Sequence, residues 1–208
     1  MYMSAFLGKI HYWLYNKILL QEKLIGDITE LAKEKGYSSN TLLETSYSKY
    51  GFPVVGELED VIEHSNIHGW LQEQIIGVES RLAYVITELV KTNTLTQEEI
   101  TNVFFQDGEI RGNELGNVQG TPEDFFQLIF DYLLEGMPCD RVNNITANTA
   151  IHMSWETTRD LHQAYWDQVG GDIRNYNCYR NAWINGFLLV SEYEYQHSDD
   201  GINTIRKV

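Results

Sequence analysis

The sequence predicts an all-α protein, a helical bundle built around an internal duplication. Three observations support this prediction. Apolar residues recur at steps of three and four along much of the chain, as they do on the buried face of an amphipathic helix. Helix start and stop signals separate these segments. Finally, two of the segments align without gaps at a shift of 57 residues.

The first half of the chain predicts two long helices. Residues 4–35 carry a regular apolar stripe, with Ser4 as the expected N-cap and Gly36 as the expected stop. Residues 57–92 repeat the same kind of spacing. These two helices are expected to form the spine of the bundle, because they are the longest predicted elements.

The middle of the chain contains two helix starts. Thr96 is followed three residues later by a glutamate, which is the pattern of a capping box. Thr121 is followed by proline and two acids, a combination that suits the first turn of a helix. The second of these helices should end by Gly136, and residues 139–150 are expected to be irregular.

The C-terminal part predicts two further helices. Ser154 is the expected cap of the first, which should stop at Gly170. The second is expected over residues 172–195, and the tail from His197 should be loose. Together, the C-terminal helices of about residues 121–195 are expected to cover the duplicated part. No stretch alternates apolar and polar residues clearly enough to predict a strand.

The duplication is clearest between residues 10–22 and 67–79. They read IHYWLYNKILLQE and IHGWLQEQIIGVE, and six of the thirteen positions are identical. The same shift pairs further residues of like character: Gly36 with Asn93, Ser39 with Thr96, Tyr47 with Phe104 and Gly51 with Gly108. We therefore expect repeat units of a long and a short helix, about 4–51 and 57–108, related by an approximate two-fold within a single all-α domain of residues 1–208.

The composition narrows the classes of partner. The 208 residues have a formal net charge of −15, and most of the acidic excess lies in residues 52–151. Such a surface repels phosphate groups, so neither nucleic acid nor an anionic membrane is an expected partner. No run reaches the roughly 18 apolar residues of a membrane-spanning helix. The two cysteines fit a reducing compartment, so the expected location is cytoplasmic.

The repeat places a histidine and a glutamate on each long helix. His11 and Glu22 fall on one line of the first helix, and His68 and Glu79 on one line of the second. If the helices pack antiparallel, His11 approaches Glu79 and His68 approaches Glu22, which would fix the helix register. If the helices pack parallel, the two histidines meet in one layer and the two carboxylates in another.

A metal site is the alternative use of these residues. His64 and His68 are four residues apart, a spacing that allows two side chains of one helix to chelate an ion. With His11 as a third ligand, and with Glu22 or Glu79 nearby, the bundle could hold zinc or iron. A second, similar cluster would comprise His152, Glu156 and His162.

Two other features of the sequence are more simply interpreted as structural. Glycines recur at every fourth residue over 108–120, and we expect them to mark a flexible connection. Aromatic residues and arginines of the C-terminal part could line a pocket for an aromatic or anionic ligand, although core packing is the commoner role of such aromatics. These residues are Trp155, Tyr165, Trp166, Tyr176, Tyr179 and Trp183, with Arg159, Arg174 and Arg180.

Two hypotheses about function follow. The favoured one is a cytoplasmic, non-catalytic helical binding or interaction protein, whose partner is a protein, a small molecule or a second copy of the chain. The alternative is a zinc- or iron-binding helical bundle that uses the His64/His68 pair and could be a metalloenzyme. The sequence does not choose between an enzyme and a binding protein, and it does not specify a substrate.

Overall fold

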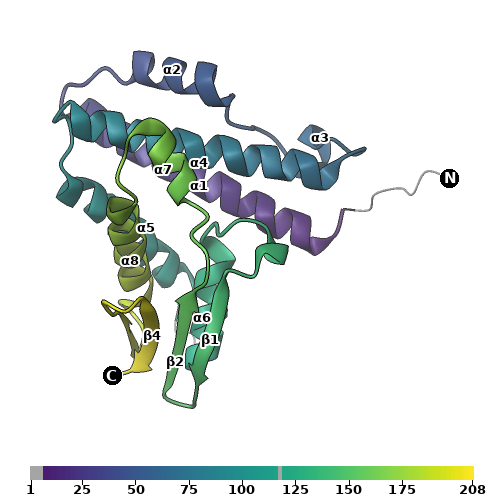
Figure 1. The fold of residues 1–208 in the computed structure, drawn as a ribbon, viewed down its shortest axis with the longest axis vertical. Helices are drawn as coiled ribbons and strands as arrows, with labels where there is room; N and C mark the ends of the chain where they lie inside the picture. Colours follow the sequence, from purple (N-terminus) through teal and green to yellow (C-terminus); the bar gives the residue numbers. More distant parts are fainter. Residues whose placement is uncertain (1–6, 117–118) are drawn as a thin grey trace. The chain divides into compact units, whose positions relative to one another are not determined.

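The computed structural model describes residues 7–116 and 119–208, and the chain divides into two compact units, residues 1–94 and 95–208 (Figure 1). The boundary falls inside the second predicted repeat unit. The first unit is helical over the residues that the structure describes, whereas the second combines helices with a β-sheet.

Unit 1 is built around two long helices. Its helices are α1 (Lys9–Glu34), α2 (Asn40–Tyr50), α3 (Leu58–Val61) and α4 (Ile67–Lys91). His11 lies beside His68 near the start of α1 and α4, and Glu22 lies beside Arg81 further along the same helices. The two long helices therefore run parallel. His11 and His68 are related by the shift of 57 residues, whereas Glu22 and Arg81 are not.

The helix ends in the two repeats follow the same shift of 57. Glu34 and Lys91 end the long helices, and Asn40 and Gln97 begin the short ones. Left-handed residues stand at corresponding places, with φ of 86° at Gly36 and 54° at Asn93. The short helices have different neighbours: α2 packs against α4, whereas α5 (Gln97–Glu114) belongs to unit 2 and packs along α8 (Ile173–Leu188).

Two details of the predicted long helices need comment. The expected cap Ser4 lies outside the described residues. The predicted helix over 57–92 is interrupted, because α3 ends at Val61 and α4 begins only at Ile67. Asn66 explains the new start, since its side chain accepts a hydrogen bond from the Gly69 amide and so caps α4.

Unit 2 shows that the all-α prediction is wrong. Its further elements are α6 (Pro122–Tyr132), a 3₁₀ turn η1 (Pro138–Asp140), β1 (Asn143–Asn148), β2 (His152–Thr157), α7 (Gln163–Val169), β3 (Tyr193–His197) and β4 (Ile202–Lys207). The four strands form one antiparallel sheet in the order β1, β2, β4, β3. The protein is thus mixed α and β, and the sheet occupies segments for which we expected an irregular segment, parts of helices and a loose tail.

Side-chain contacts explain why these segments form strands, although their sequence pattern suggested helices. Ser154, the expected helix cap, is a residue of β2 that pairs with Thr204 of β4, where their hydroxyls are 2.9 Å apart. Its neighbours Met153 and Trp155 are both buried in the core of unit 2. In β3, two buried tyrosines alternate with more exposed polar residues, which is the period of a strand.

Two glycines of the predicted flexible connection lie in a close helix contact. Gly108 and Gly112 belong to α5, and a Cβ atom added at Gly112 would stand 2.2 Å from the carbonyl oxygen of Phe187 in α8. Gly186 of α8 meets the backbone of α5 in the same way. Because only glycine permits this approach, the expectation of a flexible connection is wrong for α5. The contact fixes α8 against its neighbour.

Several of the predicted helix signals are confirmed. Thr96 and Thr121 form capping boxes at the starts of α5 and α6. The stop at Gly170 is also confirmed, since this residue ends α7 in the left-handed conformation. The helix predicted from residue 172 begins there as α8, capped by Asp172, which accepts a hydrogen bond from the Arg174 amide. These signals depend on a few adjacent residues, which is why the sequence reveals them.

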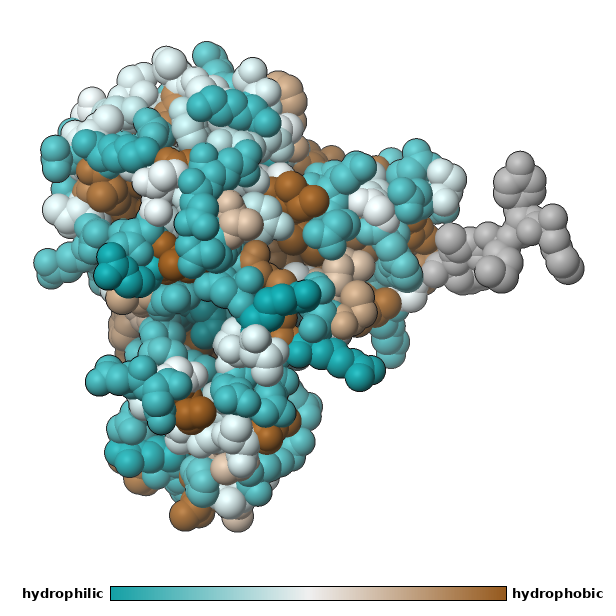
Figure 2. Space-filling view, viewed as in Figure 1, coloured by the Kyte–Doolittle hydropathy of each residue, from teal (hydrophilic) through white to brown (hydrophobic). Residues whose placement is uncertain are grey.

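Within the part of the chain that the structure describes, no helix has the length and apolar character needed to cross a membrane. On the face seen in Figure 2, hydrophilic residues predominate, and the apolar side chains are scattered among them. The most exposed large apolar residues include Phe52 and Val55, which lie in the segment before α3.

Candidate functional site

The predicted site residues of unit 1 do not converge on one centre. His11 and His68 meet, with their Nε2 atoms 3.2 Å apart. His64 lies in the turn before α4, where its Nε2 atom is 3.1 Å from the Glu59 carbonyl oxygen. The HxxxH pair is therefore not carried by one helix.

The rings of His11 and His68 are placed to form a hydrogen bond between their Nε2 atoms. The Gly8 amide donates to Nδ1 of His11 at 2.9 Å, so the proton of the neutral ring is on Nε2. That proton points at Nε2 of His68. Burial and the neighbouring His68 both lower the pKa of His11, which favours this neutral form.

The two predicted glutamates, Glu22 and Glu79, also lie apart from the histidines. Glu22 forms an ion pair with Arg81, whose Nη1 atom also donates to the carbonyl oxygens of Tyr50 and Gly51 at 3.1 and 2.8 Å. Glu79 is buried in α4. Because α1 and α4 run parallel, the His11/Glu79 and His68/Glu22 pairs of the antiparallel alternative do not form.

The described residues, 7–116 and 119–208, contain no group of three or more histidine, cysteine, aspartate or glutamate side chains placed to hold a metal ion. The second expected cluster is also dispersed. His152 contacts Thr149, Glu156 accepts a hydrogen bond from Asn144, and His162 faces Glu135. The arrangement therefore lends the metal hypothesis no support.

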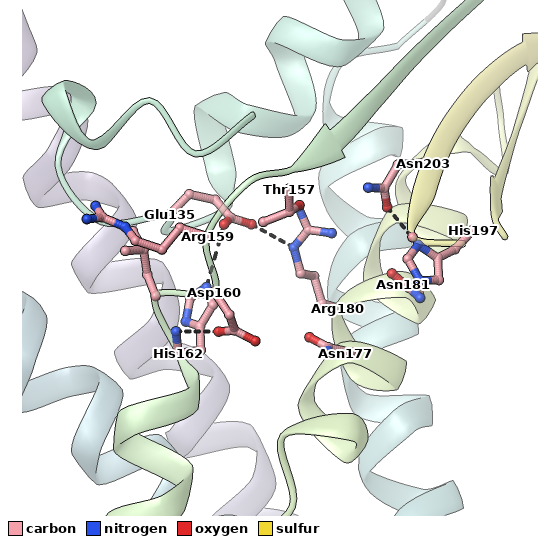
Figure 3. A pocket seen from close by; sticks show the side chains of 12 residues that line it. Glu135, Thr157, Arg159, Asp160, His162, Asn177, Arg180, Asn181, His197 and Asn203 are labelled. Carbon is pink, nitrogen blue, oxygen red and sulfur yellow. Dashed lines mark hydrogen bonds and ion pairs between the residues drawn. The ribbon is translucent and has the colours of Figure 1, made fainter. Parts of the chain in front are cut away.

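A pocket of about 210 Å³ opens in unit 2 and is lined mostly by polar residues (Figure 3). It is lined by the chain after α6, the end of β2, the loop from β2 to α7, helix α8, and the hairpin formed by β3 and β4. The residues labelled in the figure are Glu135, Thr157, Arg159, Asp160, His162, Asn177, Arg180, Asn181, His197 and Asn203.

A buried ion pair forms one wall. Nε of Arg180 donates to Oε1 of Glu135 at 2.6 Å, and Nε2 of His162 lies 3.6 Å from Oε2 of the same carboxylate. Burial alone would raise the pKa of Glu135, but the charge of Arg180 and the nearby His162 lower it to about 2. The pair is therefore ionised at neutral pH.

The guanidinium of Arg180 is incompletely bonded. The residue is only 8% exposed, and its Nη2 atom is buried without a hydrogen-bond partner among the described residues. Burial tends to lower the pKa of Arg180, but the attraction of Glu135 outweighs this and raises it. A permanently charged donor group thus lies in the wall of an open pocket.

The floor carries a network of amides around a tyrosine. The Tyr195 hydroxyl lies 2.8 Å from Oδ1 of Asn181 and 2.6 Å from Oδ1 of Asn203. Nδ1 of His197 is 3.0 Å from the same Asn203 oxygen. Burial is the main cause that raises the pKa of Tyr195 to about 12, so its hydroxyl stays protonated.

The rim is more exposed and is ordered by local contacts. Arg159 forms an ion pair with Asp140 at 2.7 Å. Oδ1 of Asp160 accepts hydrogen bonds from the amides of His162 and Gln163 at 2.7 and 2.9 Å, which fixes the loop before α7. In Figure 3 the Asp160 carboxylate points toward the middle of the pocket.

The sequence singled out some of these residues in other roles. Arg159 and Arg180 line the pocket, but Arg174 lies at the surface, paired with Asp172. Five of the six aromatic residues proposed beside them are buried in the core of unit 2, and Tyr165 is half-buried: Trp155, Trp166, Tyr176, Tyr179 and Trp183 are the buried ones. Sequence reasoning missed Glu135 and Asn203. Asn203 lies on the unpredicted strand β4, and Glu135 lies after α6, where no local pattern marks it.

Comparisons with protein-family models, with curated proteins and with solved structures return no match to this chain. The site is therefore interpreted from its own residues.

Proposed function

We propose that unit 2 is a binding module for a small polar molecule, which docks through a carboxylate or a similar oxygen acceptor on Arg180. One observation carries the proposal. Nη2 of Arg180 is buried at the pocket wall without a hydrogen-bond partner among the described residues. A buried donor left unbonded costs about 1–3 kcal/mol, and more when it is charged. A ligand oxygen at this position would recover that free energy.

The rest of the pocket supports binding by hydrogen bonds. The side chains of Asn177, Asn181 and Asn203 line it together with His197. Amides donate and accept hydrogen bonds but are not nucleophiles, so they suit recognition better than covalent chemistry. This agrees with the favoured hypothesis from the sequence, a binding protein, and assigns the ligand to the class of small molecules.

The volume limits the size of the ligand. About 210 Å³ is below the ~300–1,000 Å³ of pockets that hold drug-sized molecules. A small metabolite fits such a pocket, whereas a dinucleotide or a folded peptide does not.

Thermal unfolding with a panel of small carboxylic acids, α-amino acids included, and the corresponding amides tests this function. A compound present at one hundred times its Kd adds about 2.7 kcal/mol to native stability, which corresponds to a rise of several degrees in Tm. We expect at least one acid to raise Tm of the wild type, and Arg180→Lys to abolish the rise, because lysine keeps the charge beside Glu135 but has one nitrogen in place of the three of the guanidinium.

A matched control is available on the same helix. Arg174 likewise pairs with a carboxylate, that of Asp172, but it is exposed to solvent, so Arg174→Lys should bind the same acid as well as the wild type. The proposal fails if no acid shifts Tm, or if Arg180→Lys responds as the wild type does.

A further inference from the structure

The charged side chains that line the pocket of unit 2 differ in whether another residue of the chain forms an ion pair with them. Four charged residues other than the histidines line the pocket: Glu135, Arg159, Asp160 and Arg180. Glu135 is paired with Arg180 and approached by His162, and Arg159 is paired with Asp140. Asp160 differs, because it has no ionic partner among the described residues.

The hydrogen bonds of Asp160 leave its charge in place. Both amides that it binds contact Oδ1, and neither carries a formal charge. The second oxygen, Oδ2, is left for another partner, and Figure 3 shows the carboxylate directed into the same central space that the Arg180 guanidinium borders. The pocket thus has a positively charged hydrogen-bond donor in its wall and a negatively charged hydrogen-bond acceptor at its rim.

We propose that the bound molecule is a zwitterion of the α-amino acid type, whose carboxylate meets Arg180 and whose ammonium group meets Asp160. This inference rests on the proposed function of the pocket. The ammonium group supplies the cation that Asp160 lacks, and the Asn177 amide, which lines the same space, can bond either end of the ligand.

The charge balance of the pocket argues against simpler ligands. The four charged side chains sum to zero, so a simple anion gains no net attraction and meets repulsion from Asp160. A simple amine would pair with Asp160 but would leave Nη2 of Arg180 unbonded. A dipolar ligand bonds both Arg180 and Asp160 at once. The pocket would therefore discriminate against ligands that leave one of these two groups unpaired.

The test compares each of the standard α-amino acids with the carboxylic acid that lacks its amino group, by isothermal titration calorimetry on the full chain. For any side chain that the pocket accepts, we expect the amino acid to bind at least tenfold more tightly than its deaminated partner. The same comparison is repeated with Asp160→Asn, which keeps the oxygen that accepts the two backbone amides and removes only the charge.

The outcomes separate the two proposals. In Asp160→Asn we expect the tenfold preference to disappear while the deaminated acid binds as tightly as before or more tightly. If the deaminated acid binds the wild type as well as the amino acid does, the zwitterion inference is wrong and the proposed function stands. If neither member of any pair binds, both are wrong. A preference that survives in Asp160→Asn would also refute the role of Asp160.

Discussion

Among the described residues, each unit contains one buried arginine paired with a glutamate, and the pair has a different role in each unit. In unit 1, Arg81 donates from Nη2 to Glu22 and from Nη1 to the carbonyl oxygens of Tyr50 and Gly51. In unit 2, Arg180 donates from Nε to Glu135, and its Nη2 atom has no hydrogen-bond partner within the described chain. The first arginine joins three helices, whereas the second borders a pocket.

The comparison shows that the same residue pair is not by itself a sign of function. What distinguishes the two sites is whether the chain satisfies the terminal amino groups of the guanidinium. Arg81 binds the C-terminal end of α2, where carbonyl oxygens lack partners within the helix. Arg180 instead faces a space that no other part of the described chain fills. Buried pairs of the first kind are structural, and those of the second kind are candidate sites.

The largest expected effect is on Arg81. Arg81→Ala leaves Glu22 without its partner in a largely buried place, and breaking a buried pair in this way costs about 3–5 kcal/mol. Urea unfolding followed by amide exchange in α1 and α4 would measure the loss in unit 1. The exposed Arg174→Ala serves as control and should leave stability unchanged. An equal response of the two variants would remove the basis of the comparison.

The pH dependence of unit 2 should depend on Glu135. Its pKa falls from an ordinary 4.5 to about 2, so the folded state favours the ionised form. The resulting stability is present above about pH 4.5 and is lost as the pH falls toward 2. It amounts to about 3 kcal/mol at neutral pH.

The variant Glu135→Gln checks this pH dependence. Its stability should lie below that of the wild type at pH 7, and the difference should vanish near pH 2. The exposed Glu192→Gln, which removes a surface pair with Lys207, is the control. A difference between wild type and Glu135→Gln that is constant over this range would contradict the ionised pair.

A smaller effect on stability is expected from replacing a helix glycine by alanine in each unit. Gly112→Ala puts a methyl group against the Phe187 backbone and should destabilise unit 2 by about 1–3 kcal/mol, as overpacking does. Gly26 lies in α1 with no atom within 4 Å of an added Cβ, so Gly26→Ala should stabilise unit 1 through helix propensity. Thermal unfolding of the two variants should therefore show shifts of opposite sign, and shifts of the same sign would contradict the close contact of α5 and α8.

The smallest expected effect concerns the histidine pair. Burial and the neighbouring His68 lower the pKa of His11, so a ring-proton titration by NMR should give a value below 6.5. His68→Ala should move that value upward, because the repulsion between two protonated rings is removed. An unchanged titration of His11 in this variant would show that the two rings do not interact.

Much of the helical part could be predicted from the sequence. The helix starts at Thr96 and Thr121 and the stop at Gly36 are local signals, and the structure uses each of them. The repeat also indicated that His11 and His68 would meet if the long helices were parallel. The choice between parallel and antiparallel packing depends on contacts far apart in the chain, which one sequence does not reveal.

The sheet and the pocket could not be predicted in the same way. In β3 the alternation of Tyr193 and Tyr195 with polar residues was a usable strand signal, but it spans only five residues and follows directly on the helical pattern of α8. The pocket depends on this sheet, since β3 and β4 supply His197 and Asn203. Glu135 and Arg180 are 45 residues apart, one after α6 and the other in α8, so no local pattern connects them.

The most direct test of the central claim is an NMR titration that follows the Arg180 side-chain Nε–H signal while an α-amino acid selected by calorimetry is added. We predict that this signal shifts together with amides of α8 and β4, that it saturates with the Kd found by calorimetry, and that signals of α1 and α4 stay in place. If the amino acid binds with no change at Arg180, or if the changes lie in unit 1, the pocket of unit 2 is not the binding site.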